Sequence, residues 1–166
     1  RYLCNMKDLN SKDNSKVEAE LDRAEKNGDI KWVKPLLHAF RDRPEDALRE
    51  RMRTMLSTIK LSGAEGIYIE ELEIGDCSAI SADILGFIWS AGFNPSNKLD
   101  LITRIATNGD FRAAMEGLTI IEQCESIDEE HVLLEAILNV RGAIENCEDE
   151  SLKAMYEPML VLSLIH

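Results

Sequence analysis

Long apolar runs are missing from this chain of 166 residues. The longest is Met159-Leu160-Val161-Leu162, whereas a helix that crosses a bilayer needs roughly 18 consecutive apolar residues or more. We therefore predict that the chain has no membrane-spanning segment and that a membrane is not its partner.

Glycine, proline and aromatic residues are scarce, with 9 Gly, 4 Pro and 5% aromatic residues. Glycine and proline mark turns, and aromatic residues are enriched in strands. Their low number favours an all-α fold. At this length we expect one domain that is long enough to bury a core.

Cysteine motifs are absent. The four cysteines, Cys4, Cys77, Cys124 and Cys147, are separated by 73, 47 and 23 residues, which matches no zinc or redox spacing. Two disulfides would suit an exported protein, whereas free thiols suit a reducing compartment. We favour free thiols and predict a cytoplasmic location.

Catalytic and metal-binding motifs are missing as well. Serine, cysteine and histidine never combine in a nucleophile motif, and no glycine-rich loop follows a strand. The histidines lack the spacing of metal ligands and are more typical of a surface: His38, His131 and His166. One acidic run lacks the fixed spacing of ligands that a calcium-binding loop needs: Glu65, Glu70, Glu71, Glu73 and Asp76. We assign no catalytic, cofactor-binding or metal-binding residue.

Charge is present in abundance, but it is unevenly distributed. Residues 1–60 contain 14 Lys+Arg and 11 Asp+Glu, a net charge of +3. Residues 61–166 contain 5 Lys+Arg and 20 Asp+Glu, a net charge of −15, so that the whole chain has a net charge of −12. One interpretation is a polarised surface that steers a basic partner to the acidic part or brings two copies together head to tail. The other is an acidic exterior that keeps the protein soluble.

The segment from Asp29 to Lys60 predicts two amphipathic helices joined by a turn. At 100° per residue, one arc of about 160° holds the apolar residues of the first helix, Ile30, Trp32, Val33, Leu36, Leu37 and Phe40. An arc of about 100° holds those of the second, Leu48, Met52, Met55, Leu56 and Ile59.

Two prolines bear on the bounds of these helices. Pro44 suits the opening turn of the second helix, where no N–H partner is lost. Pro35 lies inside the first helix, and it should bend that helix or delay its start. Asp29 is a suitable N-cap for the first helix.

This pair resembles a HEAT repeat, an armadillo-type α-solenoid unit that often has a proline in its first helix, an aspartate in the turn and a basic residue early in its second helix. Pro35, Asp42 and Arg49 stand in those places, with Asp42 about one residue early. The segment Gly109–Leu118 resembles another second helix, although no proline precedes it in the matching place. The resemblance implies a short α-solenoid of antiparallel helix pairs with right-handed stacking, and a habit of binding other molecules.

The remaining pattern predicts a flexible segment over residues 1–14 and a single helical-repeat domain over residues 15–166. Further helices are expected at 15–27, 78–91, 98–108, 111–124, 129–146 and 150–165, the last kinked at Pro158. Residues 62–76 alternate like a strand at Ile67-Tyr68-Ile69, and we predict an irregular segment there with a short helix as the alternative. Helix should exceed about 60% of the chain, against a base rate of about one third. The predicted core includes Leu37, Phe40, Met52, Leu56, Ile84, Ile88, Leu118, Ile137 and Val140.

The densest basic cluster comprises Arg41, Arg43, Arg49, Arg51 and Arg53. Such a cluster could contact phosphates, and some helical-repeat proteins grip DNA, including a DNA glycosylase family. However, acidic residues interleave with these arginines, and the pI of about 4.7 is unlike that of a duplex binder. We therefore favour intramolecular ion pairs over a nucleic-acid site.

Two functions remain open. The favoured one is a non-enzymatic interaction or scaffold module that presents a helical-repeat groove to a protein or peptide. The alternative is an enzyme or regulatory subunit with a scattered concave-face site, including the nucleic-acid-acting glycosylase type. A deep pocket that contains a paired aromatic residue and carboxylate would support the enzyme alternative. Exposed apolar residues in an open groove would support the interaction module. Candidate partner contacts are Arg43, Arg49, Arg53, Trp32 and Trp89.

The last eight residues, Met159 to His166, include six apolar ones. That number exceeds what one helix face can bury against one neighbouring repeat. We therefore expect either a homodimer through the C-terminal helix or a longer repeat protein of which this chain is a fragment.

Overall fold

The computed structural model describes the backbone of residues 3–165 and the side chains of residues 7–165. Helices account for 77% of the chain, and the described residues contain no strand. This confirms the predicted all-α class and the predicted helix content. The predictions that concern Cys4 and His166 lie outside the described side chains.

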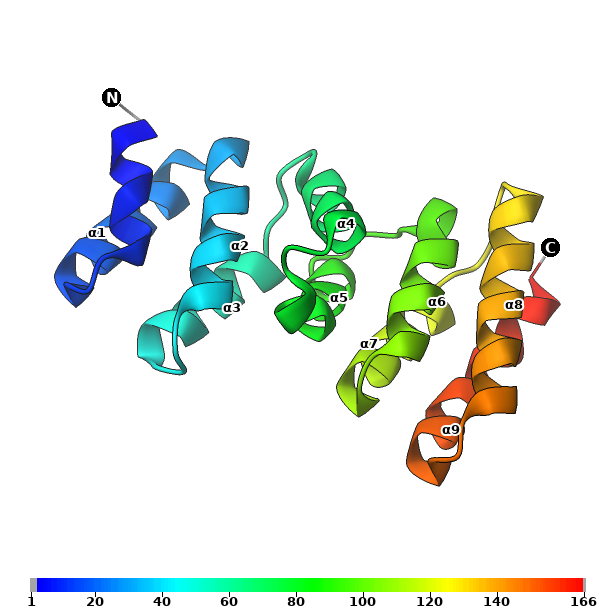
Figure 1. Cartoon of the computed structure of the whole chain (residues 1–166). Coiled ribbons are helices and arrows are strands. Elements are labelled where there is room, and N and C mark those ends of the chain that lie inside the picture. The colour runs from blue at the N-terminus through cyan, green and yellow to red at the C-terminus, as the bar shows by residue number, and fades with distance from the viewer. Residues whose placement is uncertain (1–2, 166) are drawn as a thin grey trace. The chain divides into compact units, whose positions relative to one another are not determined.

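The chain divides into two compact units, residues 1–68 and 69–166, and the boundary falls inside helix α4 (Ala64–Ile74). The first unit contains, with η for a 3₁₀ helix, η1 (Leu3–Asn10), α1 (Asn14–Asn27), η2 (Ile30–Trp32), α2 (Val33–Asp42) and α3 (Ala47–Ser57) (Figure 1). The second contains η3 (Ser78–Ile80), α5 (Ser81–Ser90), η4 (Ser96–Lys98), α6 (Leu99–Asn108), α7 (Phe111–Glu122), α8 (Glu130–Asn146), α9 (Glu150–Tyr156) and η5 (Glu157–Leu164). The single repeat domain stays a prediction.

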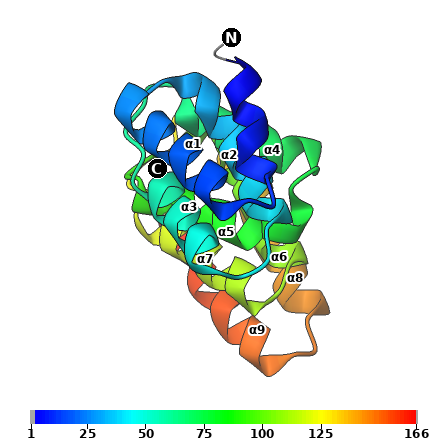
Figure 2. The same cartoon turned by 90° about the vertical axis from the view of Figure 1, so that its left-hand side faces the viewer.

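In the first unit, α2 and α3 pack against each other, α1 packs against α3, and η1 packs against α1 and α2. Figure 2 shows these helices from a second direction. Leu37, Phe40, Met52 and Leu56 are fully buried, as predicted. Within the segment predicted to be flexible, η1 places Leu9 in the core with 2% exposure. The flexibility of residues 1–14 itself stays a prediction.

The two prolines of the first pair behave differently. Because η2 occupies Ile30–Trp32, α2 begins only at Val33, and Pro35 falls in its first turn, where no N–H partner is needed. This confirms that Pro35 delays the helix. The prediction for Pro44 is wrong, since α3 begins at Ala47 and Pro44 lies in the preceding loop.

Aspartate N-caps open the second helix of three pairs. Asp46 accepts a hydrogen bond from the backbone N–H of Arg49 at 2.7 Å, and Asp110 accepts one from Ala113 at 2.9 Å. Asp149 caps α9 through Ser151 at 2.8 Å. Each carboxylate satisfies an N–H that the first helical turn leaves without a partner, and its negative charge suits the helix N-terminus.

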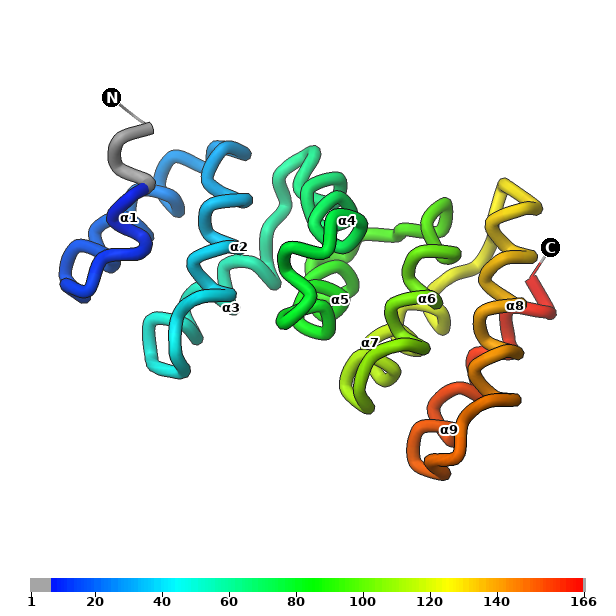
Figure 3. Tube along the Cα trace, viewed as in Figure 1, coloured from blue at the N-terminus to red at the C-terminus, as the bar shows by residue number. Residues whose placement is uncertain are grey.

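In the second unit, helices two apart in the chain pack against each other: α5 against α7, α6 against α8, and α7 against α9. Helix α7 also packs against η5, which follows α9 directly. The backbone leaves α8, turns into α9 and returns through η5, which packs against α8 (Figure 3). Ile84, Ile88 and Val140 are fully buried, as predicted.

Two predicted core residues are only half-buried, so the prediction is wrong for Leu118 and Ile137. In α8 the buried row is Val132, Ala136 and Val140, which recurs every four residues and lies beside Ile137 on the helix surface. The buried face of α7 is rich in small residues, which leaves Leu118 at its edge: Ala113, Ala114, Gly117, Ile120 and Ile121.

Gly117 permits the close approach of α7 to α6, because a Cβ at this position would overlap the Cβ of Ala106. We expect Gly117→Ala to lower the free energy of unfolding by about 1–3 kcal/mol through overpacking. Gly142 in α8 is the matched control, since a Cβ there meets no atom within 4 Å. Gly142→Ala should raise the stability by up to about 1 kcal/mol, because alanine has the higher helix propensity. Urea denaturation measures both, and changes of the same sign would contradict this packing.

Most of the segment 62–76 forms the helix α4. The predicted irregular segment is therefore wrong, and the alternative of a helix is confirmed. Two of its glycines delimit the helix and have positive φ, Gly63 at 91° and Gly75 at 84°. Such a conformation favours glycine and ends or precedes a helix without strain. The glycines therefore mark the helix bounds, and Tyr68 inside α4 is completely buried.

Pro158 changes the last helix as well. The α-helical hydrogen bonds of α9 end at Tyr156, and the chain continues as the 3₁₀ helix η5. Proline has no N–H to donate, so the carbonyl four residues earlier loses its partner and the helix tightens. The change of helix type lies at the predicted position, while the kink itself stays a prediction.

Candidate functional site

The arginines of the basic cluster form ion pairs within the first unit. Arg41 pairs with Asp42 at 2.7 Å and Arg43 with Asp46 at 2.8 Å. The remaining pairs are Arg49 with Glu45, Arg51 with Asp22 and Glu25, and Arg53 with Glu50. The hydrogen bond from Arg43 and that from the Arg49 backbone hold the pKa of Asp46 below its ordinary value. The predicted intramolecular ion pairs are confirmed, whereas the absence of a nucleic-acid site stays a prediction.

Arg49 serves the helix pair itself. It is 9% exposed, and its Nε donates to the carbonyl oxygen of Phe40 at 2.8 Å. In an unbroken helix that carbonyl would accept from residue 44, but Pro44 has no N–H. The Arg49 guanidinium also lies 4.0 Å from the ring centroid of Phe40, and that of Arg53 lies 4.9 Å from it. Both cations therefore stabilise the turn between α2 and α3.

Trp32 is 5% exposed and lies in the core of the first unit. Its indole Nε1 is buried and has no hydrogen-bond partner in the described structure. The ring forms part of the wall of a cavity of about 420 Å³, together with Arg51, Met55 and Ile59. Core packing therefore accounts for most of this side chain, and it offers little surface to a partner.

Trp89 is half-buried, and its Nε1 donates to Oε2 of Glu116 at 3.3 Å. A second polar link joins the same two helices, since Arg112 pairs with Asp83 at 2.6 Å. Both links cross from α7 to α5. This aromatic and carboxylate pair thus has a packing role, and neither residue lines the cavity formed by α6, α8 and α9.

That cavity, of about 560 Å³, lies between the end of α6, α8 and α9. Three asparagines contribute to its wall, Asn108, Asn139 and Asn146. Tyr156 donates to the carbonyl of Thr107 at 3.3 Å, and burial raises the pKa of its phenol. The wall is polar and partly open, and the Sγ of Cys147 donates to the carbonyl of Asp149 at 3.2 Å. No pair of catalytic groups is present in this wall.

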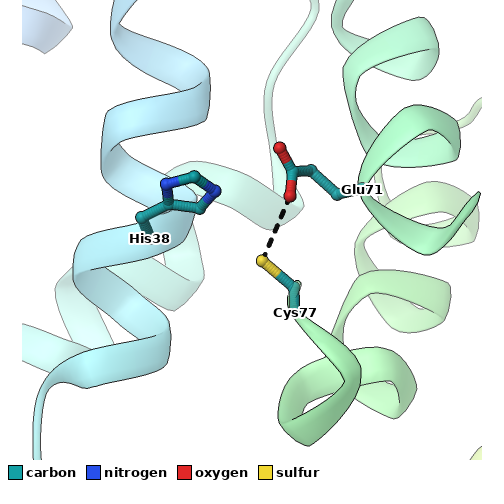
Figure 4. Close-up of side chains that lie close together, drawn as sticks. All are labelled: His38, Glu71 and Cys77. Carbon is teal, nitrogen blue, oxygen red and sulfur yellow. Dashed lines mark hydrogen bonds between the residues drawn. The ribbon is translucent and has the colours of Figure 1, made fainter. Parts of the chain in front are cut away.

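The described cysteines are free thiols, in agreement with the favoured prediction: Cys77, Cys124 and Cys147. Within the second unit, Cys77 Sγ lies 3.4 Å from Oε2 of Glu71 and donates a hydrogen bond to it (Figure 4). His38, drawn in the same figure, belongs to the first unit. Burial raises the pKa of Cys124, which makes that thiol a poor nucleophile.

Exposed apolar side chains belong to the second unit. In the described part of the chain, all seven large apolar residues with high exposure follow residue 68: Ile74, Phe111, Met115, Leu134, Leu138, Val161 and Leu164. Sequence reasoning placed none of them at a partner surface except those at the C-terminus. The signal that could have found Leu134 and Leu138 is the apolar set of α8, which is too wide for one buried face.

Between residues 3 and 165, none of the helices has the length and apolar character needed to cross a membrane. No protein-family model matches this chain, and searches of curated proteins and of solved structures give no match.

Proposed function

We propose that the chain is a HEAT-like helical-repeat module that binds another protein without catalysing a reaction. Two features support the repeat architecture. Second-unit helices two apart in the chain pack together, as they do in stacked helix pairs. An aspartate caps the second helix in three pairs, as Asp46, Asp110 and Asp149 show. The right-handed stacking stays a prediction.

The observation that supports binding is the combination of exposed apolar side chains and unbalanced charge in the second unit. Residues 69–166 contain 5 Lys+Arg and 19 Asp+Glu, a net charge of −14. Residues 1–68 contain 14 Lys+Arg and 12 Asp+Glu, a net charge of +2. Exposed apolar groups in a polar surround mark interaction surfaces. An acidic surround attracts a basic protein and repels nucleic acid.

The structural observations give less support to the enzyme alternative. The aromatic and carboxylate pair Trp89–Glu116 joins two helices, and the wall of the cavity between α6, α8 and α9 lacks a pair of acid and base. The regulatory-subunit alternative shares the protein-binding surface proposed here, and a scaffold role stays a prediction. The cytoplasmic location and the homodimer through the C-terminal helix also stay predictions.

Affinity capture tests the proposed function. We expect the immobilised chain to retain a basic protein in roughly stoichiometric amount from a native extract. At least one of two double variants, Phe111→Ser/Met115→Ser and Leu134→Ser/Leu138→Ser, should reduce retention, because each replaces a pair of exposed apolar residues. Lys26→Ala/Lys31→Ala, at exposed positions of the first unit, is the control and should leave retention unchanged. Equal retention by all variants, or none by the wild type, would contradict the proposal.

A further inference from the structure

Four of the seven exposed large apolar side chains in the described part of the chain belong to α8 and η5, which pack against each other. We call this surface the end face and define it by Leu134, Ile137 and Leu138 of α8 and Val161 and Leu164 of η5. Leu134 is 53% exposed, Leu138 61% and Leu164 72%. The element η5 returns beside α8 (Figure 3).

Helix geometry makes the α8 part of the end face continuous. Leu134 and Leu138 are one turn apart, and at 100° per residue they lie roughly opposite the buried row Val132, Ala136 and Val140. Half-buried Ile137 lies between these two rows. An apolar stripe of this kind complements the i, i+4 apolar positions of another helix, which is the usual mode of helix recognition in grooves.

The charges around the end face are mostly negative. Exposed carboxylates on α8 and at the start of η5 are Glu130, Glu135, Glu145 and Glu157, against one exposed cation, Arg141. Among the described residues these four carboxylates form no ion pair, unlike the acidic residues of the first unit. Their charge is therefore available to a cationic partner, and added salt should weaken that attraction.

We propose that the end face binds an amphipathic helix of a different protein, with leucine-like residues on one side and Lys or Arg beside them. This proposal rests on the proposed function and specifies its partner. A second copy presenting the same face would bring like charges together, which is destabilising. A head-to-tail copy is also disfavoured, because the first-unit arginines Arg43, Arg49 and Arg51 already pair within their own chain.

A pair of designed peptides tests the proposal. Each peptide has about 20 residues, which is long enough to form a helix, and both have the same leucine stripe. Beside the stripe, one peptide has Lys at the positions where the other has Glu. By fluorescence anisotropy at low salt, the Lys peptide should bind the whole chain at least about tenfold more tightly than the Glu peptide, and high salt should reduce this preference. Glu130→Gln/Glu145→Gln should reduce it too. Comparable binding of both peptides, or of neither, would overturn the proposal.

Matched variants locate the binding surface. Leu134→Ser/Leu138→Ser should weaken binding of the Lys peptide about tenfold or more, because two leucines lose their buried contacts. Phe111→Ser/Met115→Ser, an equally exposed apolar pair on α7, should leave the affinity unchanged. The reverse pattern would overturn the proposal.

Two further results separate this proposal from the proposed function. If affinity capture succeeds and depends only on Phe111 and Met115, the end-face proposal fails while the proposed function stands. If capture retains no protein, the proposed function fails as well. Light scattering that shows a dimer in the wild type and a monomer in Leu134→Ser/Leu138→Ser would identify a second copy as the occupant and overturn the proposal.

Discussion

Leu56→Ala should lower the free energy of unfolding by about 2–5 kcal/mol, because it removes a fully buried side chain and leaves a cavity. Leu56 lies in α3, and its carbonyl accepts a hydrogen bond from the hydroxyl of Tyr68 at 2.6 Å. The phenol is completely buried and its pKa is raised by that burial, so the surrounding site cannot readily admit water. Urea denaturation followed by far-UV circular dichroism measures the loss.

Ile137→Ala is the comparison for this prediction. The sequence predicted that Ile137, like Leu56, is a core residue, but the structure leaves Ile137 half-exposed. We expect a loss of roughly half that of Leu56→Ala or less, since less apolar surface is withdrawn from water. Equal losses at the two positions would show that α8 is oriented differently from the structure described here.

Arg49→Ala should cost about 2–4 kcal/mol. The substitution removes a charge-assisted hydrogen bond to the carbonyl of Phe40 and a cation–π contact with its ring. The carbonyl then loses this donor, and Pro44 cannot replace Arg49 because it has no N–H. The ion pair with exposed Glu45 adds little, since solvent screens it. Thermal denaturation measures the effect.

Two controls distinguish the hydrogen bond from charge alone. Arg53→Ala removes a cation that also lies over Phe40, at 4.9 Å, but that donates to exposed Glu50 instead of a backbone carbonyl. It should cost less than about 1 kcal/mol. Arg49→Lys keeps the positive charge but loses the planar guanidinium group with its several N–H donors. Its loss of stability should lie between those of Arg53→Ala and Arg49→Ala. If Arg53→Ala costs as much as Arg49→Ala, the carbonyl of Phe40 does not depend on Arg49.

Most of the helices were predictable because their apolar residues recur with helical spacing. In α2 and α3 that spacing identified Leu37, Phe40, Met52 and Leu56 as core residues, and all four are buried. Helix ends were less predictable. Asp46 and Pro44 are both good residues for a helix start, and only the hydrogen bond from Arg49 N to Asp46 shows which one begins α3.

The surfaces were harder to predict, because they depend on residues distant in the chain. Arg51 in α3 pairs with Asp22, 29 residues earlier in α1, so no local pattern shows that its charge is neutralised. Trp32 lies on the apolar arc of its helix and was also a candidate partner contact, and packing leaves it 5% exposed. In α8, apolar residues cover more than one side of the helix, and the sequence alone does not show that Leu134 and Leu138 remain uncovered.

The aspartate caps at Asp46, Asp110 and Asp149 have a consequence for how the chain reaches its structure. Each cap bonds to a backbone group only two or three residues away, so the turn between two helices can form before distant contacts exist. Chains dominated by such local contacts fold quickly, because little loop-closure entropy is lost before contacts are made. We therefore expect that folding can begin at any of these three turns. A substitution that slows one of these nuclei leaves the others able to start the reaction.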